Sequence, residues 1–163
     1  MGFLTTLAMA MTFFAAGEVA SAGAGSAAFE QLKSLVGEWH GQRPDGRKIG
    51  VTYRLSAGGS VLVETWNLGP QRESLTIYHM DGSALMASHF CPQGNQPRLR
   101  MTQATESRFD FSFYDATGID PGEAVQREFW IEIGADGRIT RSETYVQADE
   151  SESETITYER VKL

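Results

Sequence analysis

The sequence from Glu73 to Arg98 reads ESLTIYHMDGSALMASHFCPQGNQPR. Two runs of alternating apolar and polar residues meet at Asp81-Gly82, and a polar loop bounded by Pro92 and Pro97 follows them. Asp-Gly between alternating runs is the strongest short-range indication of a β-hairpin. The stretch therefore predicts two antiparallel strands, and most of the chain repeats this pattern.

One amphipathic segment precedes the strands. Phe29, Leu32, Leu35 and Val36 have helical spacing and predict a short helix that begins at Ser26 as its N-cap. Ten strands are expected after it, at residues 37–43, 48–57, 61–68, 73–80, 83–91, 98–104, 108–115, 125–133, 138–147 and 154–162. Many short strands joined by turns are typical of an all-β, antiparallel up-and-down β-barrel.

The first 22 residues do not share this pattern. Phe3 to Ala16 is apolar and Ala20-Ser21-Ala22 resembles a cleavage site, so residues 1–22 are expected to be a secretory signal peptide. No Lys or Arg precedes the run, which leaves an uncleaved membrane anchor as the alternative, although the run is shorter than the ~20 apolar residues of a membrane span. We therefore expect one domain, residues 23–163, that is periplasmic or secreted and has no stable membrane span after cleavage.

Charge and cysteine content narrow the function classes. A formal charge of -7 over 163 residues argues against nucleic acid and anionic membranes as partners, because phosphates need Lys and Arg. Cys91 is the only cysteine, so it cannot form an internal disulfide in an oxidising compartment. We interpret it as a buried small residue, with a reactive thiol or an intermolecular link as alternatives.

The predicted turns differ between the two ends of the barrel. In a meander, alternate connections lie at opposite ends. The connections at Gly58-Gly59, Asp81-Gly82, 105–107 and Asp136-Gly137 are tight, whereas those at 92–97, 116–124 and 148–153 are long. One end is therefore expected to be closed and the other to carry mobile loops around a mouth, and a barrel of this size holds one small ligand.

Three sets of residues carry a family resemblance. Gly37-Glu38-Trp39 resembles the G-x-W signature of the lipocalin and fatty-acid-binding-protein superfamily, the calycins, which implies a barrel with this Trp near its closed end. The segments 78–82, 89–91 and 94–98, which read YHMDG, HFC and GNQPR, are similar to an uncharacterised family of exported bacterial lipocalin-like proteins. The ten strands also resemble the nitrobindin-like haem barrels, but those place the haem-ligating His late in the chain, and His89 is the last histidine here.

Hairpin register decides where two of the histidines point. A two-residue Asp81-Gly82 turn pairs Ser74 with His89, which places His79 and His89 on opposite faces. The apolar residues beside His79 favour its face as the interior, which leaves His89 outside or at the rim. A bulge after the turn would reverse one of the two.

Catalytic and metal sites are not expected. The G-x-S-x-G, phosphate-loop and H-E-x-x-H motifs are missing from the sequence, so we do not expect an enzyme. His40, His79, His89 and Cys91 show no zinc-site spacing, so no metal or other cofactor is expected. His89 and Cys91 share a strand face, and a thiolate–imidazolium pair is the remaining alternative.

Two charged residues fall on predicted apolar faces. A Gly58-Gly59 turn pairs Tyr53 with Glu64 and places Glu64 inside the barrel, and Arg127 alternates with the apolar residues of its own strand. A buried charge needs a partner, because an isolated one is very costly. The two residues either anchor the polar end of a ligand, or pair with each other or with hydroxyl groups in a buried network.

The remaining interior residues are apolar or carry hydroxyl groups. A two-residue Asp136-Gly137 turn pairs three apolar residues of one strand with three hydroxyl residues of the next: Phe129 with Thr144, Ile131 with Ser142 and Ile133 with Thr140. An aromatic row at Phe109, Phe111 and Phe113 faces the same interior. Such a lining is typical of a small-molecule pocket and equally of a filled barrel core.

These features together predict an exported β-barrel that binds a small, largely hydrophobic molecule with one polar end. Glu64 and Arg127 anchor the polar end, and four aromatic residues bury the apolar body, namely Phe109, Phe111, Phe113 and Phe129. His89, Asn95 and Arg98 shape the mouth, where the loop between the two prolines either gates the site or merely joins two strands. The alternatives are a haem- or metal-binding barrel that uses a histidine, and an envelope interaction domain with a filled interior.

Overall fold

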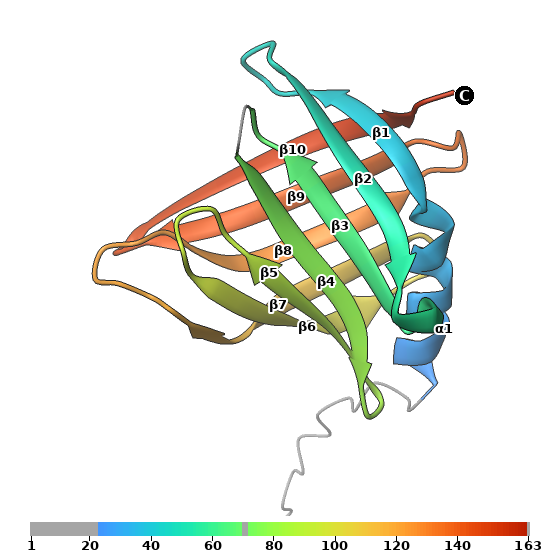
Figure 1. The fold of residues 1–163 in the computed structure, drawn as a ribbon, viewed down its shortest axis with the longest axis horizontal. Helices are drawn as coiled ribbons and strands as arrows, with labels where there is room; N and C mark the ends of the chain where they lie inside the picture. Colours follow the sequence, from blue (N-terminus) through green and yellow to red (C-terminus); the bar gives the residue numbers. More distant parts are fainter. Residues whose placement is uncertain (1–22, 70–71, 163) are drawn as a thin grey trace, which may run out of the picture.

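A computed structural model describes residues 23–69 and 72–162. Ten antiparallel strands close into one barrel, in which each strand pairs with its sequence neighbours and β1 pairs with β10 (Figure 1). The elements are α1 (Ala24–Leu32), a 3-10 turn (Lys33–Leu35), β1 (Gly37–Gln42), β2 (Lys48–Ser56), β3 (Val61–Asn67), β4 (Glu73–Asp81), β5 (Ala84–Phe90), β6 (Gln96–Ala104), β7 (Arg108–Thr117), β8 (Val125–Ile133), β9 (Ile139–Gln147) and β10 (Glu150–Arg160). The prediction of a ten-stranded up-and-down barrel after one short helix is confirmed.

The predicted signal peptide, residues 1–22, lies outside the described residues. Within the described residues, no helix has the length and apolar character needed to cross a membrane.

The helix covers the closed end of the barrel. It packs against β4, β5 and β6, and it buries Ala28, Phe29 and Leu32 (Figure 1). A Cβ atom at Gly25 would lie 2.4 Å from the carbonyl oxygen of Ser83, so only glycine allows this close approach. The N-cap is Gly23 and not Ser26, so the helix begins three residues earlier than the apolar spacing predicts.

Trp39 joins the start of β1 to the end of β10. Its Nε1 donates a hydrogen bond of 2.7 Å to the carbonyl oxygen of Leu35, and the guanidinium of Arg160 lies 4.2 Å from the centre of a Trp39 ring. Arg160 also donates to the carbonyl oxygens of Val36 and Ser34, at 2.6 and 2.7 Å. Trp39 therefore lies near the closed end, and the architecture is compatible with a lipocalin-like fold.

The opposite end carries the β1–β2, β3–β4, β5–β6, β7–β8 and β9–β10 connections. The predicted long loop at 148–153 is wrong, because β9 and β10 pair up to Gln147 and Glu150 and are joined through Ala148, which adopts a left-handed φ of 52°. The β7–β8 loop is tethered to its neighbours: Gln147 Nε2 donates to the carbonyl oxygen of Gly122 at 2.6 Å.

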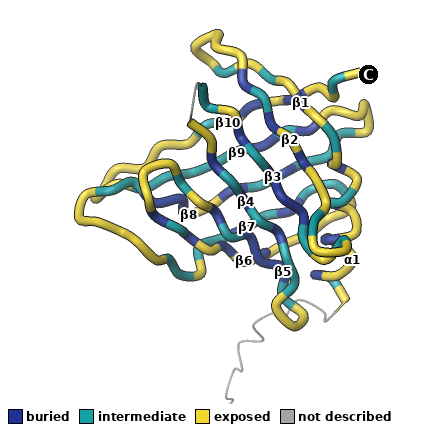
Figure 2. Tube along the Cα trace, in the orientation of Figure 1, coloured by how far each residue is buried: buried dark blue, intermediate teal, exposed yellow. Residues whose placement is uncertain are grey.

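The register of the β4–β5 hairpin differs by two residues from the predicted one. Thr76 pairs with His89, so His79 and His89 lie on opposite faces as expected. Figure 2 shows both buried and half-buried positions along β4. The buried ones are Ser74, Thr76 and Tyr78, whereas His79 is only half-buried. The prediction that the face of His79 is the interior is therefore wrong, because the inward polar side chains find hydrogen-bond partners inside the barrel.

The register of the β8–β9 hairpin differs from the predicted one by a single residue. Ile133 pairs with Ile139 and Phe129 with Glu143, since the connection between the strands has an odd number of residues. A one-residue shift moves every side chain of a strand to its other face. The predicted interior positions of Thr140, Ser142 and Thr144 are therefore wrong, and the inner face of β9 carries Arg141, Glu143 and Tyr145.

A β-bulge in β8 changes the position predicted for Arg127. The pairing skips from Gln126 to Glu128, so Gln126 faces Tyr145 across the ladder and is fully buried. Arg127 is half-buried, and its guanidinium lies 4.1 Å from the centre of the Phe113 ring. The uninterrupted alternation assumed for this strand is wrong.

Candidate functional site

A cavity of about 380 Å³ opens at the mouth end of the barrel. Its apolar wall includes Ile49, Trp66, Leu68, Ile156 and Tyr158, and its inward polar residues include Ser74, His89, Arg141, Glu143 and Tyr145. Charged residues from the surrounding connections and strand ends form its rim, namely Arg43, Arg47, Arg72, Glu152 and Glu154. A concave, mixed lining of this kind is typical of a small-molecule site.

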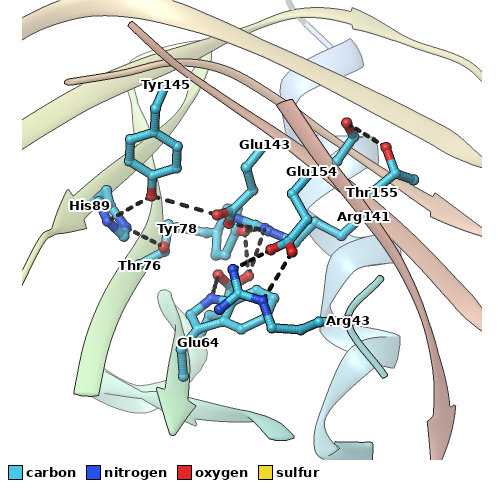
Figure 3. A network of polar contacts seen from close by, with 12 residues as sticks. Arg43, Glu64, Thr76, Tyr78, His89, Arg141, Glu143, Tyr145, Glu154 and Thr155 are labelled. Atoms are coloured by element: carbon cyan, nitrogen blue, oxygen red, sulfur yellow. Dashed lines mark hydrogen bonds and ion pairs between the residues drawn. The ribbon is translucent and has the colours of Figure 1, made fainter. Parts of the chain in front are cut away.

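Glu64 lies fully buried beneath the cavity and receives three donors (Figure 3). Its Oε2 accepts hydrogen bonds from the Tyr78 hydroxyl at 2.6 Å and from Arg141 Nη1 at 2.9 Å. Trp66 Nε1 donates to the other carboxylate oxygen. Both oxygens therefore act as acceptors, as in an ionised carboxylate, and the expectation that Glu64 needs a buried partner is confirmed. The partner is Arg141 and not Arg127.

Arg141 joins this buried cluster to the cavity. Its Nε donates to Glu143 Oε1 at 2.9 Å, and its guanidinium lies 4.3 Å from the centre of the Phe129 ring. Burial is the largest single influence on the pKa of Arg141 and lowers it, but the combined effects of Glu64, Tyr78, Glu143 and Tyr53 outweigh burial and raise that pKa well above its ordinary value. Arg141 is thus a permanent buried cation. Its Nη2 has no hydrogen-bond partner among the described residues.

His89 stands on the wall of the cavity rather than outside the barrel. Its Nδ1 lies 3.1 Å from the Thr76 hydroxyl oxygen, and its Nε2 lies 3.4 Å from the Tyr145 hydroxyl oxygen (Figure 3). Burial, and then the charge of Arg141, lowers the pKa of His89 to about 4. The imidazole is therefore neutral near pH 7 and can both donate and accept a hydrogen bond.

Asn95 and Arg98 lie outside the cavity wall. Asn95 is buried, and its Nδ2 donates to Glu123 Oε2 and to the carbonyl oxygen of Ala124, each at 3.1 Å. Arg98 is exposed on β6 and forms an ion pair with Asp115. Asn95 thus fastens the β7–β8 loop beside the mouth, whereas Arg98 belongs to the outer surface.

The phenylalanines fill the barrel below the cavity. Phe111 and Phe129 stack with their ring centres 4.5 Å apart, and Tyr78 meets them edge-on at 5.8 and 6.2 Å. Phe109 is fully buried, and Phe113 is half-buried under Arg127. Of the four phenylalanines, Phe129 packs against the guanidinium of Arg141, while the wall of the cavity is built by other residues.

Sequence reasoning missed Arg141, Glu143 and Tyr145. In the segment ITRSETYV, charged and hydroxyl residues alternate regularly, so the pattern itself is visible. Alternation does not say which of its two sets faces inward, and the assumed turn length selected the wrong one.

Cys91 is half-buried and lines the cavity near His89. Over residues 23–69 and 72–162, the structure brings together no group of three or more His, Cys, Asp or Glu side chains that would hold a metal ion. The polar and apolar residues that line the cavity offer hydrogen bonds and apolar contacts to a ligand.

Comparison with known proteins adds no family to this geometry. Neither the protein-family models nor the curated proteins give a match to this chain.

Proposed function

We propose that the protein is a lipocalin-like binding protein that takes a small, largely apolar molecule with one polar end into its mouth cavity. The proposal is one of binding and not of catalysis. The polar end lies at the floor, next to Arg141 and His89, and the apolar body lies along Trp66, Leu68 and Ile156.

One observation carries this proposal: the unpartnered Nη2 of the buried Arg141 belongs to a residue that lines an open cavity. A buried donor without a partner costs about 1–3 kcal/mol, and more where the group is charged. A ligand that accepts this hydrogen bond recovers that cost on binding. Binding of a molecule whose polar end reaches this depth is therefore favourable.

We also propose that binding takes place outside the cytoplasm. The apolar run and the small residues within positions 1–22 support export. An apolar ligand in an aqueous compartment gains from a carrier, because burial of apolar surface contributes about 25 cal/mol per Å². Fractionation of the expressing cells, with N-terminal sequencing of the mature protein, tests this proposal. Full-length protein confined to the cytoplasm would contradict it.

The binding test compares two serine-to-tryptophan variants by calorimetric titration with decanol. Ser74 lies on the inner face and lines the cavity, whereas Ser153 is exposed on the outer face of β10. We expect wild type and Ser153→Trp to bind decanol alike and Ser74→Trp to lose binding, because the new indole fills the cavity. Equal affinities of all three proteins would place any binding elsewhere.

A filled barrel without a ligand is tested at Phe111. Because Phe111 packs below the cavity, Phe111→Ala should lower the free energy of unfolding by about 3–5 kcal/mol. On our proposal, the affinity of Phe111→Ala for decanol, at a temperature where the variant is folded, stays near the wild-type value.

An absorption spectrum and a native mass spectrum of the exported protein, purified gently, add an independent check. A Soret band or a bound metal would favour the haem- or metal-binding alternative.

A further inference from the structure

The buried cluster below the cavity carries unequal charge. Arg141 is one cation between two carboxylates, since its Nη1 donates to Glu64 at 2.9 Å and its Nε donates to Glu143 at 2.9 Å. Both arginine–glutamate contacts are ion pairs in which the Arg141 side chain is almost completely buried. The floor of the cavity therefore has an excess of one negative charge.

The rim does not supply a compensating cation. Arg43 forms a two-pronged ion pair with Glu154, through Nε at 2.9 Å and Nη2 at 2.5 Å. Arg47 is paired with Asp45 at 2.6 Å. The two rim residues that remain, Arg72 and Glu152, have opposite charges. The rim therefore does not neutralise the excess negative charge of the floor, and this charge would repel an anion.

The unmet hydrogen bonds at the floor are of a specific kind. Arg141 Nη2 is a donor and needs an acceptor. Gln126, which pairs with Tyr145 across the β8–β9 ladder but does not line the cavity itself, is fully buried and also has neither its amide nitrogen nor its amide oxygen paired within the described part of the chain. An ammonium group has only donors and cannot satisfy Nη2. A carboxylate can satisfy it, but adds a second uncompensated negative charge in a site of low dielectric constant.

We infer that the cavity selects ligands whose polar end is uncharged and accepts a hydrogen bond, such as an alcohol or a primary amide, over carboxylic acids and amines of the same length. The inference rests on the proposed function and names its ligand class. The hydroxyl or carbonyl oxygen of the ligand accepts from Arg141 Nη2. Its O–H or N–H donates to a neighbouring acceptor of the floor, for which Glu143 and the neutral imidazole of His89 are both suited.

The test titrates the wild-type protein with four molecules that share one chain length: decanol, decanamide, decanoic acid and decylamine. At neutral pH the acid is ionised and the amine is protonated. We expect decanol and decanamide to bind at least about tenfold more tightly than the other two, a difference of roughly 1.4 kcal/mol. Tightest binding by decanoic acid or decylamine would overturn the inference and leave the proposed function standing. If none of the four binds, the proposed function fails and the inference fails with it.

A second arm changes the charge without changing the shape. Glu143→Gln removes one negative charge and keeps an oxygen that accepts from Arg141 Nε. We expect the affinity for decanoic acid to rise about tenfold relative to the affinity for decanol. Glu128→Gln, on the exposed outer face of β8, is the matched control and should change neither value. An unchanged preference in Glu143→Gln would overturn the charge argument even if wild type prefers decanol.

Discussion

Two hairpins contribute the two halves of one buried ion pair, and only one of them has the register that its sequence predicts. In β2–β3, Tyr53 pairs with Glu64 as expected, and Glu64 is buried. In β8–β9, the pairing differs by one residue, and the unpredicted Arg141 faces the interior in the place expected for Ser142. The difference shows that loop parity, more than strand sequence, decided which side chains reach the interior.

The physical reason lies in the turns. Four residues, 57–60, join β2 to β3. Because this number is even, the two-residue Gly58-Gly59 turn that was predicted gives the same residue pairs as the longer connection that is observed. Between β8 and β9, Gly134 N donates a hydrogen bond of 2.8 Å to Arg138 O and so closes a loop of residues 135–137. Within this loop, Gly137 adopts a left-handed φ of 78°. This three-residue loop shifts the register by one relative to a two-residue turn.

The same arrangement recurs in the β1–β2 and β5–β6 connections. Arg43 N donates to Arg47 O at 2.9 Å, and Cys91 N donates to Asn95 O at 3.0 Å. In both loops a proline, Pro44 or Pro92, directly follows the residue that donates this hydrogen bond. A type I turn favours proline at this position. By contrast, the glycine of Asp81-Gly82 lies in a two-residue loop, since Asp81 pairs with Ala84. An Asp-Gly pair therefore predicts a turn without giving its length.

The largest expected effect comes from changing loop parity in β8–β9. Deleting Ala135 shortens the loop by one residue and forces Arg141 and Glu143 toward the outer face, or breaks the ladders of β9 with its neighbours. We expect loss of cooperative unfolding in urea, followed by circular dichroism. Inserting two residues after Gly137 keeps the parity and should cost less than about 1 kcal/mol, because loop closure entropy grows slowly with length. A cooperative, wild-type-like transition of the deletion variant would refute the parity argument.

The second prediction concerns substitutions that remove the ion pair between the two hairpins. Arg141→Met leaves Glu64 buried without its cation and should lower the free energy of unfolding by about 3–5 kcal/mol. Glu64→Gln combined with Arg141→Met should recover a large part of that loss, because no uncompensated charge remains. Chemical unfolding of the two single variants and the double variant forms a double-mutant cycle. Additive losses would mean that the two side chains do not act as a pair.

The third prediction concerns His89 of β5, on the wall of the cavity, and the dependence of stability on pH. The folded state keeps His89 neutral down to its pKa of about 4, whereas the unfolded chain takes up a proton near 6.5. The unfolded state therefore binds more protons in this window, and stability falls as pH decreases from 6.5 to about 4, by up to about 3 kcal/mol.

The control for this prediction is His89→Gln, which has no imidazole to titrate. The surrounding charged and polar groups, Arg141, Glu64, Glu143 and Tyr145, are the same in both proteins, so the difference between their stability–pH curves isolates His89. Parallel curves between pH 4 and 6.5 would contradict the buried, neutral imidazole.

The smallest expected effects concern single turn residues, and they have opposite signs in the two hairpins. Gly137→Ala should destabilise by about 1 kcal/mol, because an L side chain is strained at φ 78°. Ala57→Gly in the β2–β3 connection should stabilise by a few tenths of a kcal/mol up to about 1, because Ala57 already has a left-handed φ of 47°. Thermal unfolding of both variants measures the two shifts, and equal signs would disprove the assignment.

Much of the fold was predictable from local patterns. The alternation of apolar residues and the turn residues predicted ten strands after one helix, and Gly37-Glu38-Trp39 predicted which end is closed. Glu64 was predictable because a carboxylate interrupts an apolar face and the register of its hairpin was right. His89 was correctly placed on the same sheet face as Thr76, but the prediction that this face points outward was wrong. The inward orientation of His89 depends on hydrogen-bond partners from β4 and β9.

Strand periodicity and turn residues act over a few neighbours, so local sequence patterns are sufficient to specify an all-β meander of ten strands, its helix-covered end and the presence of a buried carboxylate. Three features emerge from long-range packing instead: Arg141 forms the ion pair with Glu64, Gln126 takes the interior place expected for Arg127, and His89 lines the cavity. These outcomes depend on loop parity and on one β-bulge. A single residue more or less in a loop or strand changes no local preference, but it exchanges the inner and outer faces of an entire strand.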